Sequence, residues 1–231
     1  QARPDYGILD RFKNYNSIAS IISETNVAPS PPPNHSLIGQ PHSRWELLTP
    51  ALVLDLDALE RNIAAMAAWA KAGGHALRPH GKSHKSPHIA RLQAKAGAAG
   101  LCCASLREAQ VMAGEGIRGL LITTPLAPHK APLVTALVAA GGDVAVVADH
   151  VELVAAYGAA AAADGVMLQV FVDLDVGLGR TGTPSAQVAV ELAGLITAHP
   201  ALHYAGVQGY MGHLQHVDDH GERRARLEKP S

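Results

Sequence analysis

The sequence predicts an α/β fold in which helices cover a parallel sheet. Three observations support this prediction. From residue 49 onward, short aliphatic or β-branched runs alternate with longer Ala- and Leu-rich stretches at helical spacing. The short runs are largely apolar, as in strands buried on both faces. Several of the helical stretches also begin with a residue suited to capping a helix. A barrel and a doubly wound open sheet both satisfy this pattern.

The expected elements follow one another from residue 51 to residue 210. Strands are expected at 51–56, 75–79, 100–104, 119–123, 143–148, 167–173 and 203–210. Helices are expected at 57–72, 87–96, 105–115, 128–140, 150–163 and 185–199, with Asp57, Ser105 and Ser185 as N-caps. Residues 1–48 instead carry turn signals and a run of prolines. We therefore expect a poorly ordered N-terminal extension at 1–48 and a folded domain at 49–231.

Composition and charge exclude several classes of function. The chain has 231 residues, of which 48% are hydrophobic, which is enough for a sizeable core. Lys and Arg number 19 and Asp and Glu 20, so nothing favours binding to nucleic acid or to an anionic membrane. No apolar run reaches the roughly 18–20 residues that span a bilayer. The two cysteines are neighbours, Cys102 and Cys103, which excludes a disulfide scaffold and favours a cytoplasmic location.

The densest cluster of ionisable side chains lies at residues 77–87, where an expected strand ends and a helix begins. It reads Leu-Arg-Pro-His-Gly-Lys-Ser-His-Lys-Ser-Pro. Catalytic groups of α/β barrels are mounted at this edge of the sheet. A lysine there could attack a carbonyl and form a Schiff base. A solvated basic loop, or a loop that binds phosphate without covalent chemistry, stays open as an alternative.

A second cluster follows the expected strand 167–173. Residues 173–183 read Asp-Leu-Asp-Val-Gly-Leu-Gly-Arg-Thr-Gly-Thr, and the glycines permit close backbone approach. Arg180, a permanent cation with a planar fork of donors, is suited to holding an oxyanion. The alternative is a Gly-rich turn in which Arg180 merely pairs with Asp173 or Asp175.

A third cluster ends the expected strand 203–210 and continues to residue 216. It contains Tyr210, His213 and His216. These side chains could bind phosphate, accept a proton or ligate a metal, but two histidines alone are weak evidence for zinc. A plain surface loop is the alternative.

The three clusters together resemble the D-threonine aldolase and D-serine dehydratase family. The run Arg-Pro-His-Gly-Lys-Ser-His-Lys-Ser-Pro at 78–87 is similar to that family's cofactor-lysine segment, and segments 49–57, 173–183 and 206–216 agree in order and spacing. The resemblance implies a (β/α)8 barrel of the alanine racemase N-terminal type that binds pyridoxal 5'-phosphate (PLP). It also implies a lyase that acts on D-β-hydroxy amino acids.

The resemblance leaves the reaction itself open. The Gly before Lys82, and the Lys-Ser-Pro after His84, look more like an aldolase, which would cleave D-threonine to glycine and an aldehyde. A dehydratase of the D-serine type is the alternative within the family. A non-catalytic PLP-binding protein, or an inactive fragment, is the alternative outside it.

The resemblance also implies roles for individual residues. Lys82, the first lysine of the motif, would hold PLP as a Schiff base, and Lys85 would be a structural or phosphate-side cation. His216 would lie near the substrate hydroxyl as the base. The residues implied to line the cofactor site are Lys82, His80, Arg180, Gln208 and Tyr210, with Arg180 at the ring oxygen and Tyr210 at the phosphate.

Two features of the family are not found in this sequence. Family members continue past the position of Ser231, with a Gly-rich phosphate loop and a β-domain that supplies a His and an Asp or Cys for a divalent metal. We therefore expect an incomplete barrel that lacks the C-terminal β-domain and is itself inactive, with no metal ligands of its own. The full-length parent would bind Mn, Mg or Zn, take a small D-amino acid and form a homodimer.

Overall fold

The computed structural model describes residues 33–228 of the chain. Contacts within the chain separate a unit that ends at Asp55 from a second unit, Leu56–Ser231. Of the expected extension at 1–48, residues 1–32 lie outside the described residues, and residues 33–48 contain two short 3-10 helices, His35–Leu37 and Ser43–Trp45. The expected domain boundary after residue 48 stays a prediction. No helix in the described part of the chain is both long enough and apolar enough to cross a membrane.

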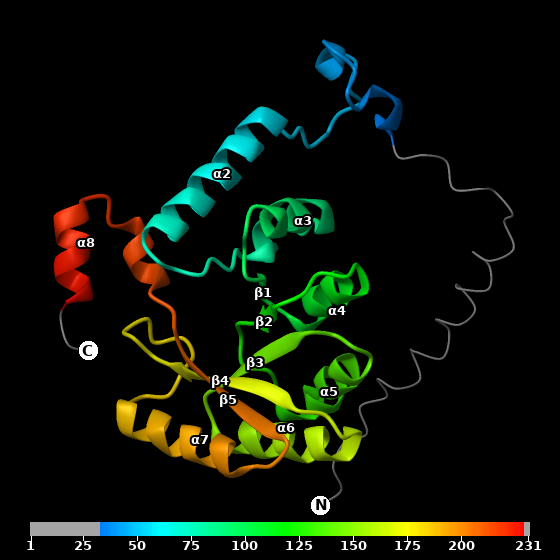
Figure 1. The fold of residues 1–231 in the computed structure, drawn as a ribbon. Helices are drawn as coiled ribbons and strands as arrows, with labels where there is room; N and C mark the ends of the chain where they lie inside the picture. Colours follow the sequence, from blue (N-terminus) through cyan, green and yellow to red (C-terminus); the bar gives the residue numbers. More distant parts are fainter. Residues whose placement is uncertain (1–32, 229–231) are drawn as a thin grey trace, which may run out of the picture. The chain divides into compact units, whose positions relative to one another are not determined.

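Five parallel strands form one sheet in the second unit, and their spatial order is their order in the chain (Figure 1). They are β1 (Leu101–Cys103), β2 (Leu120–Ile122), β3 (Val144–Ala148), β4 (Leu168–Leu174) and β5 (Leu202–Gly209). A doubly wound sheet reverses its strand order part-way, whereas a barrel keeps adding strands on one side. The observed order is therefore that of a barrel, which decides between the two architectures that the sequence leaves open.

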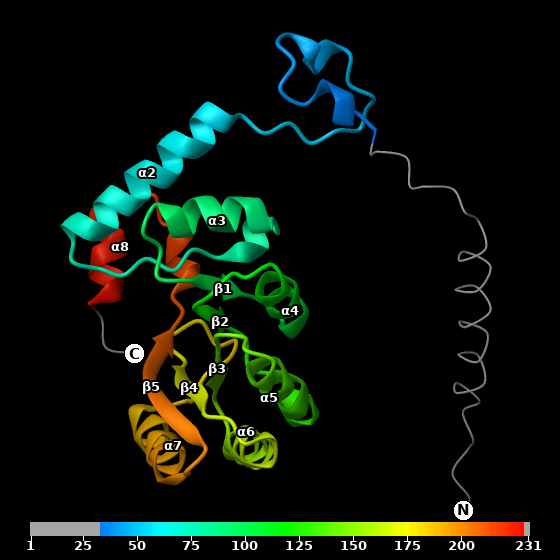
Figure 2. The ribbon, with the colours of Figure 1, turned by 45° about the vertical axis from the view of Figure 1, so that its right-hand side comes forward.

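Helices connect the strands, because parallel neighbours require a crossover. They are α4 (Leu106–Gly114), α5 (Ala131–Ala139), α6 (Val151–Asp164) and α7 (Ala186–Ala198). Helices α2 (Leu56–Ala72) and α3 (Pro87–Lys95) precede β1, and α8 (His220–Leu227) follows β5. Figures 1 and 2 show α4 to α7 along one face of the sheet. Two predicted caps are confirmed, since Ser105 and Ser185 each accept a hydrogen bond from the backbone N–H three residues on. Asp57 instead lies inside the first turn of α2.

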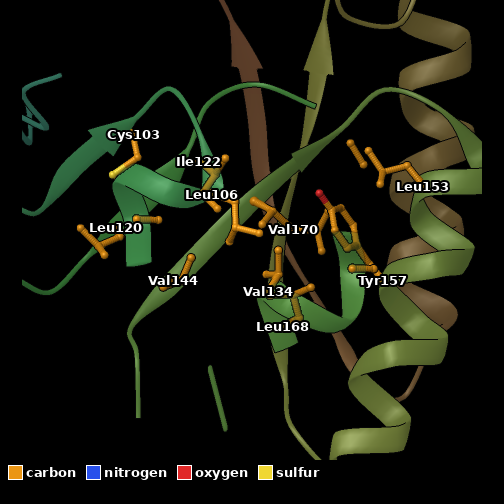
Figure 3. Close-up of a cluster of buried hydrophobic side chains, with 14 of the residues drawn as sticks. Cys103, Leu106, Leu120, Ile122, Val134, Val144, Leu153, Tyr157, Leu168 and Val170 are labelled. Atoms are coloured by element: carbon orange, nitrogen blue, oxygen red, sulfur yellow. The ribbon is translucent and has the colours of Figure 1, made fainter. Parts of the chain in front are cut away.

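The main core lies between the sheet and these helices. Alternate strand residues point toward the helices, where they meet apolar side chains of α4, α5 and α6 (Figure 3). The residues labelled there include Leu120 and Val144 from the sheet, and Leu106, Val134 and Tyr157 from the helices. The opposite face of the sheet carries a second, smaller cluster. Leu121, Ala145 and Val147 are buried there, with Cys102 and Phe171 packed against them.

Two expected strands are absent from the described residues. Residues 51–55 are not in a strand, Leu52 is fully exposed, and α2 begins at Leu56. Residues 77–80 do run beside β1, where the amide of Cys102 donates to the carbonyl of Pro79 at 2.7 Å. The pairing ends in a single parallel bridge, His80 to Cys102, because Pro79 has no N–H to continue a ladder. Helix α8 was not expected from the sequence.

Candidate active site

Lys82 lies in a tight turn between the segment beside β1 and helix α3. The turn is a 3-10 helix, Gly81–Ser83, and the ring Nδ1 of His80 caps it by accepting the N–H of Lys82 at 3.3 Å. Gly81 is buried, and a Cβ at this position would lie 2.8 Å from the Leu101 side chain. The absence of a side chain therefore lets the turn pack directly on β1, with the Lys82 amine exposed to solvent.

The hydrogen bonds of His80 determine its protonation. Because Nδ1 accepts, the neutral ring carries its proton on Nε2, which lies 3.3 Å from the Thr123 hydroxyl. That hydroxyl in turn donates to the carbonyl of Cys103 at 3.2 Å. Burial lowers the pKa of His80, and the neighbouring charge of Lys82 lowers it further. The lowered pKa favours the neutral form of His80, whose ring links the Lys82 turn to the carboxyl ends of β1 and β2.

The loop after β4 is folded back on itself. The carboxylate of Asp175 accepts the backbone N–H groups of Gly177 and Gly179, both at 3.0 Å, and these bonds hold the pKa of Asp175 below its usual value. Gly182 has a φ of 107°, and a Cβ there would overlap the backbone nitrogen of Asp175. The loop therefore requires glycine at this position, and it presents Arg180 at its outer end, exposed.

Arg180 lies over Tyr210, which follows the last residue of β5. The guanidinium carbon is 4.8 Å from the centroid of the Tyr210 ring, and the Lys82 amine is 6.0 Å from the same centroid. Within the described residues Arg180 forms no ion pair with Asp173 or Asp175, although its positive charge helps to lower the pKa of Asp173. Two cationic residues from separate sequence clusters, Lys82 and Arg180, thus converge on the aromatic ring of Tyr210 from the third.

Gln208 lies on β5, two residues before Tyr210, and its amide nitrogen is hydrogen-bonded within the protein. Its amide nitrogen donates to the Asp173 carboxylate at 2.7 Å and to the Thr123 carbonyl at 3.0 Å. Asp173 also accepts the Thr181 hydroxyl at 2.9 Å. Burial raises the pKa of Asp173, and the hydrogen bonds from Gln208 and Thr181 oppose that rise. The sequence reasoning missed Thr123 and this use of Asp173, although both stand at the carboxyl ends of expected strands.

His213 and His216 lie in the 3-10 helix Gly212–His216, which follows β5. Both side chains are exposed. Within the described residues His216 makes no hydrogen bond or ring contact with Lys82, Arg180 or Tyr210, so its role as a base stays a prediction. No group of three or more His, Cys, Asp or Glu in the described range could hold a metal ion.

Comparison with known proteins identifies the family. Residues 54–229 match the model described as alanine racemase, N-terminal domain. The chain belongs to this family. Its partial barrel of five described strands is the fold that the resemblance implied, and both the predicted family and the predicted fold class are confirmed.

Relatives of this alanine racemase N-terminal domain include enzymes named for D-β-hydroxy amino acids. The 3-hydroxy-D-aspartate aldolase of Paracoccus denitrificans (strain Pd 1222) is 41% identical over 185 residues, which cover 79% of this chain and 48% of that protein. The crystal structure of D-threonine aldolase from Filomicrobium marinum is 40% identical with a TM-score of 0.75, covering 78% of this chain and 49% of that one.

A dehydratase is also among the solved structures. The D-threo-3-hydroxyaspartate dehydratase from Delftia sp. HT23 is 30% identical with a TM-score of 0.73, covering 78% of this chain and 48% of that one. The chain thus spans about half the length of each of these relatives. It is related both to aldolases and to a dehydratase.

Proposed function

We propose that residues 49–231 are the PLP-binding barrel portion of a lyase that cleaves D-β-hydroxy amino acids by a retro-aldol reaction. The observation that carries this proposal is the convergence of Lys82 and Arg180 on the Tyr210 ring, at the carboxyl ends of the strands. The aldolase relatives, at 40% and 41% identity, support the reaction class.

The donor set fits the chemistry of PLP. An exposed primary amine on Lys82 can bond to the aldehyde of the cofactor. Arg180 forms no direct ion pair within the described residues, so its guanidinium N–H groups are available for an anionic oxygen. Tyr210 offers an aromatic face and a phenol next to both cations. When bound, PLP supplies an electron sink that stabilises negative charge at the amino acid Cα.

Each of this chain's residues then has a stated task. Lys82 anchors the cofactor, and the neutral His80 holds the turn that carries Lys82. Arg180 keeps the ring oxygen of the cofactor ionised by its fixed positive charge. His216, next to the strand end, accepts the proton of the substrate β-hydroxyl as the bond from Cα to Cβ breaks and the aldehyde leaves.

The dehydratase relative supports a second candidate. A dehydratase would use the same cofactor residues but remove a proton from Cα and expel the β-hydroxyl as water. A variant of the dehydratase relative has been solved in a form described as metal-free, which supports a divalent metal (Mn, Mg or Zn) as an additional cofactor here. That metal would act on the substrate hydroxyl in either reaction.

Product analysis separates these candidates. The complete gene product, loaded with PLP and manganese, is incubated with D-threonine or with D-serine. Glycine from D-threonine without pyruvate from D-serine is the expected result for an aldolase. Pyruvate without glycine would assign a dehydratase, and PLP binding with neither product would replace the lyase by a non-catalytic PLP-binding protein. The L-enantiomers serve as controls, since neither should react.

A further inference from the structure

Asp173 carries a charge where the sheet otherwise buries apolar side chains. With 2% of its surface exposed, it is the only charged residue buried in the described part of the chain. It has no ion-pair partner there. Burying a carboxylate is costly, so the hydrogen bonds from Gln208 and Thr181, with a smaller contribution from the charge of Arg180, have to compensate for the lost water. Its two carboxylate oxygens bind different parts of the site: Oδ1 accepts from Gln208, and Oδ2 accepts from Thr181.

One oxygen of Asp173 sets the orientation of the Gln208 amide. The amide nitrogen of Gln208 has two N–H groups and two acceptors, Asp173 Oδ1 at 2.7 Å and the Thr123 carbonyl at 3.0 Å. A flipped amide would put its oxygen against a carboxylate and a carbonyl, neither of which can donate. The carbonyl oxygen Oε1 is therefore the atom of this side chain left to accept a hydrogen bond from a ligand.

The other oxygen of Asp173 holds the loop that carries Arg180. The hydroxyl of Thr181, the next residue, donates to Asp173 Oδ2 at 2.9 Å. The loop closes on β4 at the same place, where the amide of Thr183 donates to the Asp173 carbonyl at 2.8 Å. One residue thus connects the Arg180 loop to the Gln208 side chain across β4 and β5.

We propose that Asp173 is a positioning residue for the ligand site: one carboxylate oxygen orients the Gln208 amide with its carbonyl oxygen free for a hydrogen-bond donor, and the other fixes the Arg180 loop. The proposal rests on the proposed function, since it takes the bound molecule to be PLP or its amino-acid adduct. The donor is either the protonated ring nitrogen of the cofactor or the hydroxyl of the substrate.

Asp173→Leu separates a positioning role from a structural one. Leucine has the same branched outline as aspartate, but it removes the buried charge and cannot accept a hydrogen bond. It also frees the Gln208 amide and the Thr181 hydroxyl. Asp164→Leu is the matched control, because Asp164 also binds a threonine hydroxyl, that of Thr135 at 2.6 Å, but on the helical layer away from the site.

The first measurement needs no ligand. In the 231-residue chain, hydrogen exchange of the Gln208 side-chain amide is followed by NMR. We expect slow exchange in the wild type, because both N–H groups are bonded, and faster exchange in Asp173→Leu. Unchanged exchange in Asp173→Leu would overturn the positioning role, whatever the chain binds.

The second measurement uses PLP itself as the probe. Borohydride fixes bound PLP to lysine, and the PLP concentration for half-maximal labelling of Lys82 is compared among variants. We expect it to rise about tenfold in Asp173→Leu and in Gln208→Leu, and no further in the double variant, because both changes remove one coupled contact. Asp164→Leu should not change it. Additive effects, or wild-type labelling in Asp173→Leu, would refute the coupling.

A charge-introducing variant keeps the test decisive if Asp173→Leu fails to fold. In Gln208→Glu the new carboxyl must be protonated to donate a hydrogen bond to Asp173, so labelling should weaken as pH rises. Labelling as in the wild type at every pH would overturn the proposal.

Absence of any labelling in the wild-type chain and in the complete gene product would instead refute the proposed function. Labelling is repeated with D-threonine added to identify the donor to Gln208. If the donor is the substrate hydroxyl, the effect of Gln208→Leu on labelling should depend on D-threonine; if it is the ring nitrogen of the cofactor, it should not.

Discussion

Arg180 and Tyr210 are joined by a cation–π contact, with the guanidinium carbon 4.8 Å from the ring centroid. The two residues come from different strand ends, β4 and β5, and meet because those strands are parallel neighbours whose carboxyl ends lie together. An arginine held by an aromatic face rather than by a carboxylate keeps its hydrogen-bond donors for a ligand. This contact is the basis for reading the Gly-rich loop as part of a binding site.

We predict that Lys82, and not Lys85, becomes labelled by PLP and borohydride. The Lys82 amine faces the Tyr210 ring, whereas Lys85 lies beyond the turn in a left-handed conformation with a φ of 51°. Lys82→Ala should abolish the visible absorbance band of bound PLP, and Lys85→Ala, its matched control, should only weaken it. Peptide mapping that finds the label on Lys85 would reverse the assignment.

Arg180→Ala should weaken PLP binding more than it weakens the fold. Arg180 is exposed and makes no ion pair in the described residues, so the free energy of unfolding should fall by no more than about 1 kcal/mol, the contribution of an exposed cation–π contact. The PLP concentration for half-maximal labelling should rise at least about tenfold, as expected for loss of a charged hydrogen bond. The PLP concentration for half-maximal labelling of Arg180→Lys should lie between those of the wild type and Arg180→Ala. Equal labelling in all three proteins would exclude Arg180 from the cofactor site.

Gly182→Ala should destabilise the loop after β4 more than Gly179→Ala. Both glycines have positive φ, 107° and 66°, but only at Gly182 would a Cβ overlap backbone. The strained conformation costs about 1–3 kcal/mol, and the overlap adds to it at Gly182 alone. Urea unfolding curves of the two variants measure the difference. A larger loss in Gly179→Ala would show that the loop is not packed as described.

The stability of Asp173→Asn relative to the wild type should increase as the pH rises from acidic to neutral. Burial raises the pKa of Asp173 in the folded state, so the folded protein binds this proton more tightly than the unfolded chain does. The contribution of Asp173 to stability is thus fully present below its usual pKa, about 3.9, and is lost as pH rises through the raised folded-state pKa.

Asparagine has no such titration, so the difference in urea midpoint between the variant and the wild type should grow from acidic to neutral pH. Asp175→Asn should behave in the opposite way, because hydrogen bonds from Gly179 and Gly177 lower the pKa of Asp175. Its carboxylate stabilises the fold above its usual pKa and ceases to do so as pH falls. A pH-independent difference for Asp173→Asn would contradict the burial of its charge.

The 231-residue chain by itself should bind PLP weakly, tend to aggregate and form no glycine from D-threonine with manganese. A phosphate is commonly held by backbone N–H groups of a Gly-rich loop. The Gly-rich phosphate loop that the family resemblance implies is distinct from the loop at 173–183 and is not found in these 231 residues. The sheet's second face buries only Leu121, Ala145 and Val147, and Trp69 on α2 is 68% exposed. Titration with PLP, light scattering and a glycine assay test the three parts. Tight stoichiometric binding with turnover would show that this region suffices.

The sequence by itself determined helices α2 to α7, five of the seven expected strands and the family. Buried parallel strands read as continuous apolar runs, and serine caps mark helix starts, so both are local signals. The same local signal predicted a strand at 51–56, where it was wrong. A strand exists only when another strand accepts its hydrogen bonds, and the described residues provide none for this segment.

Only the tertiary structure decided how the site residues are used. The sequence named Arg180, Tyr210 and Gln208 but could not say whether Arg180 pairs with a carboxylate or stays free. That outcome depends on strand register, which brings Asp173 beside Gln208 and occupies the Asp173 carboxylate with an amide and a hydroxyl. Such contacts join residues 35 positions apart, and no spacing rule along the chain encodes them. The order of the strands, and with it the barrel, was likewise settled by long-range pairing.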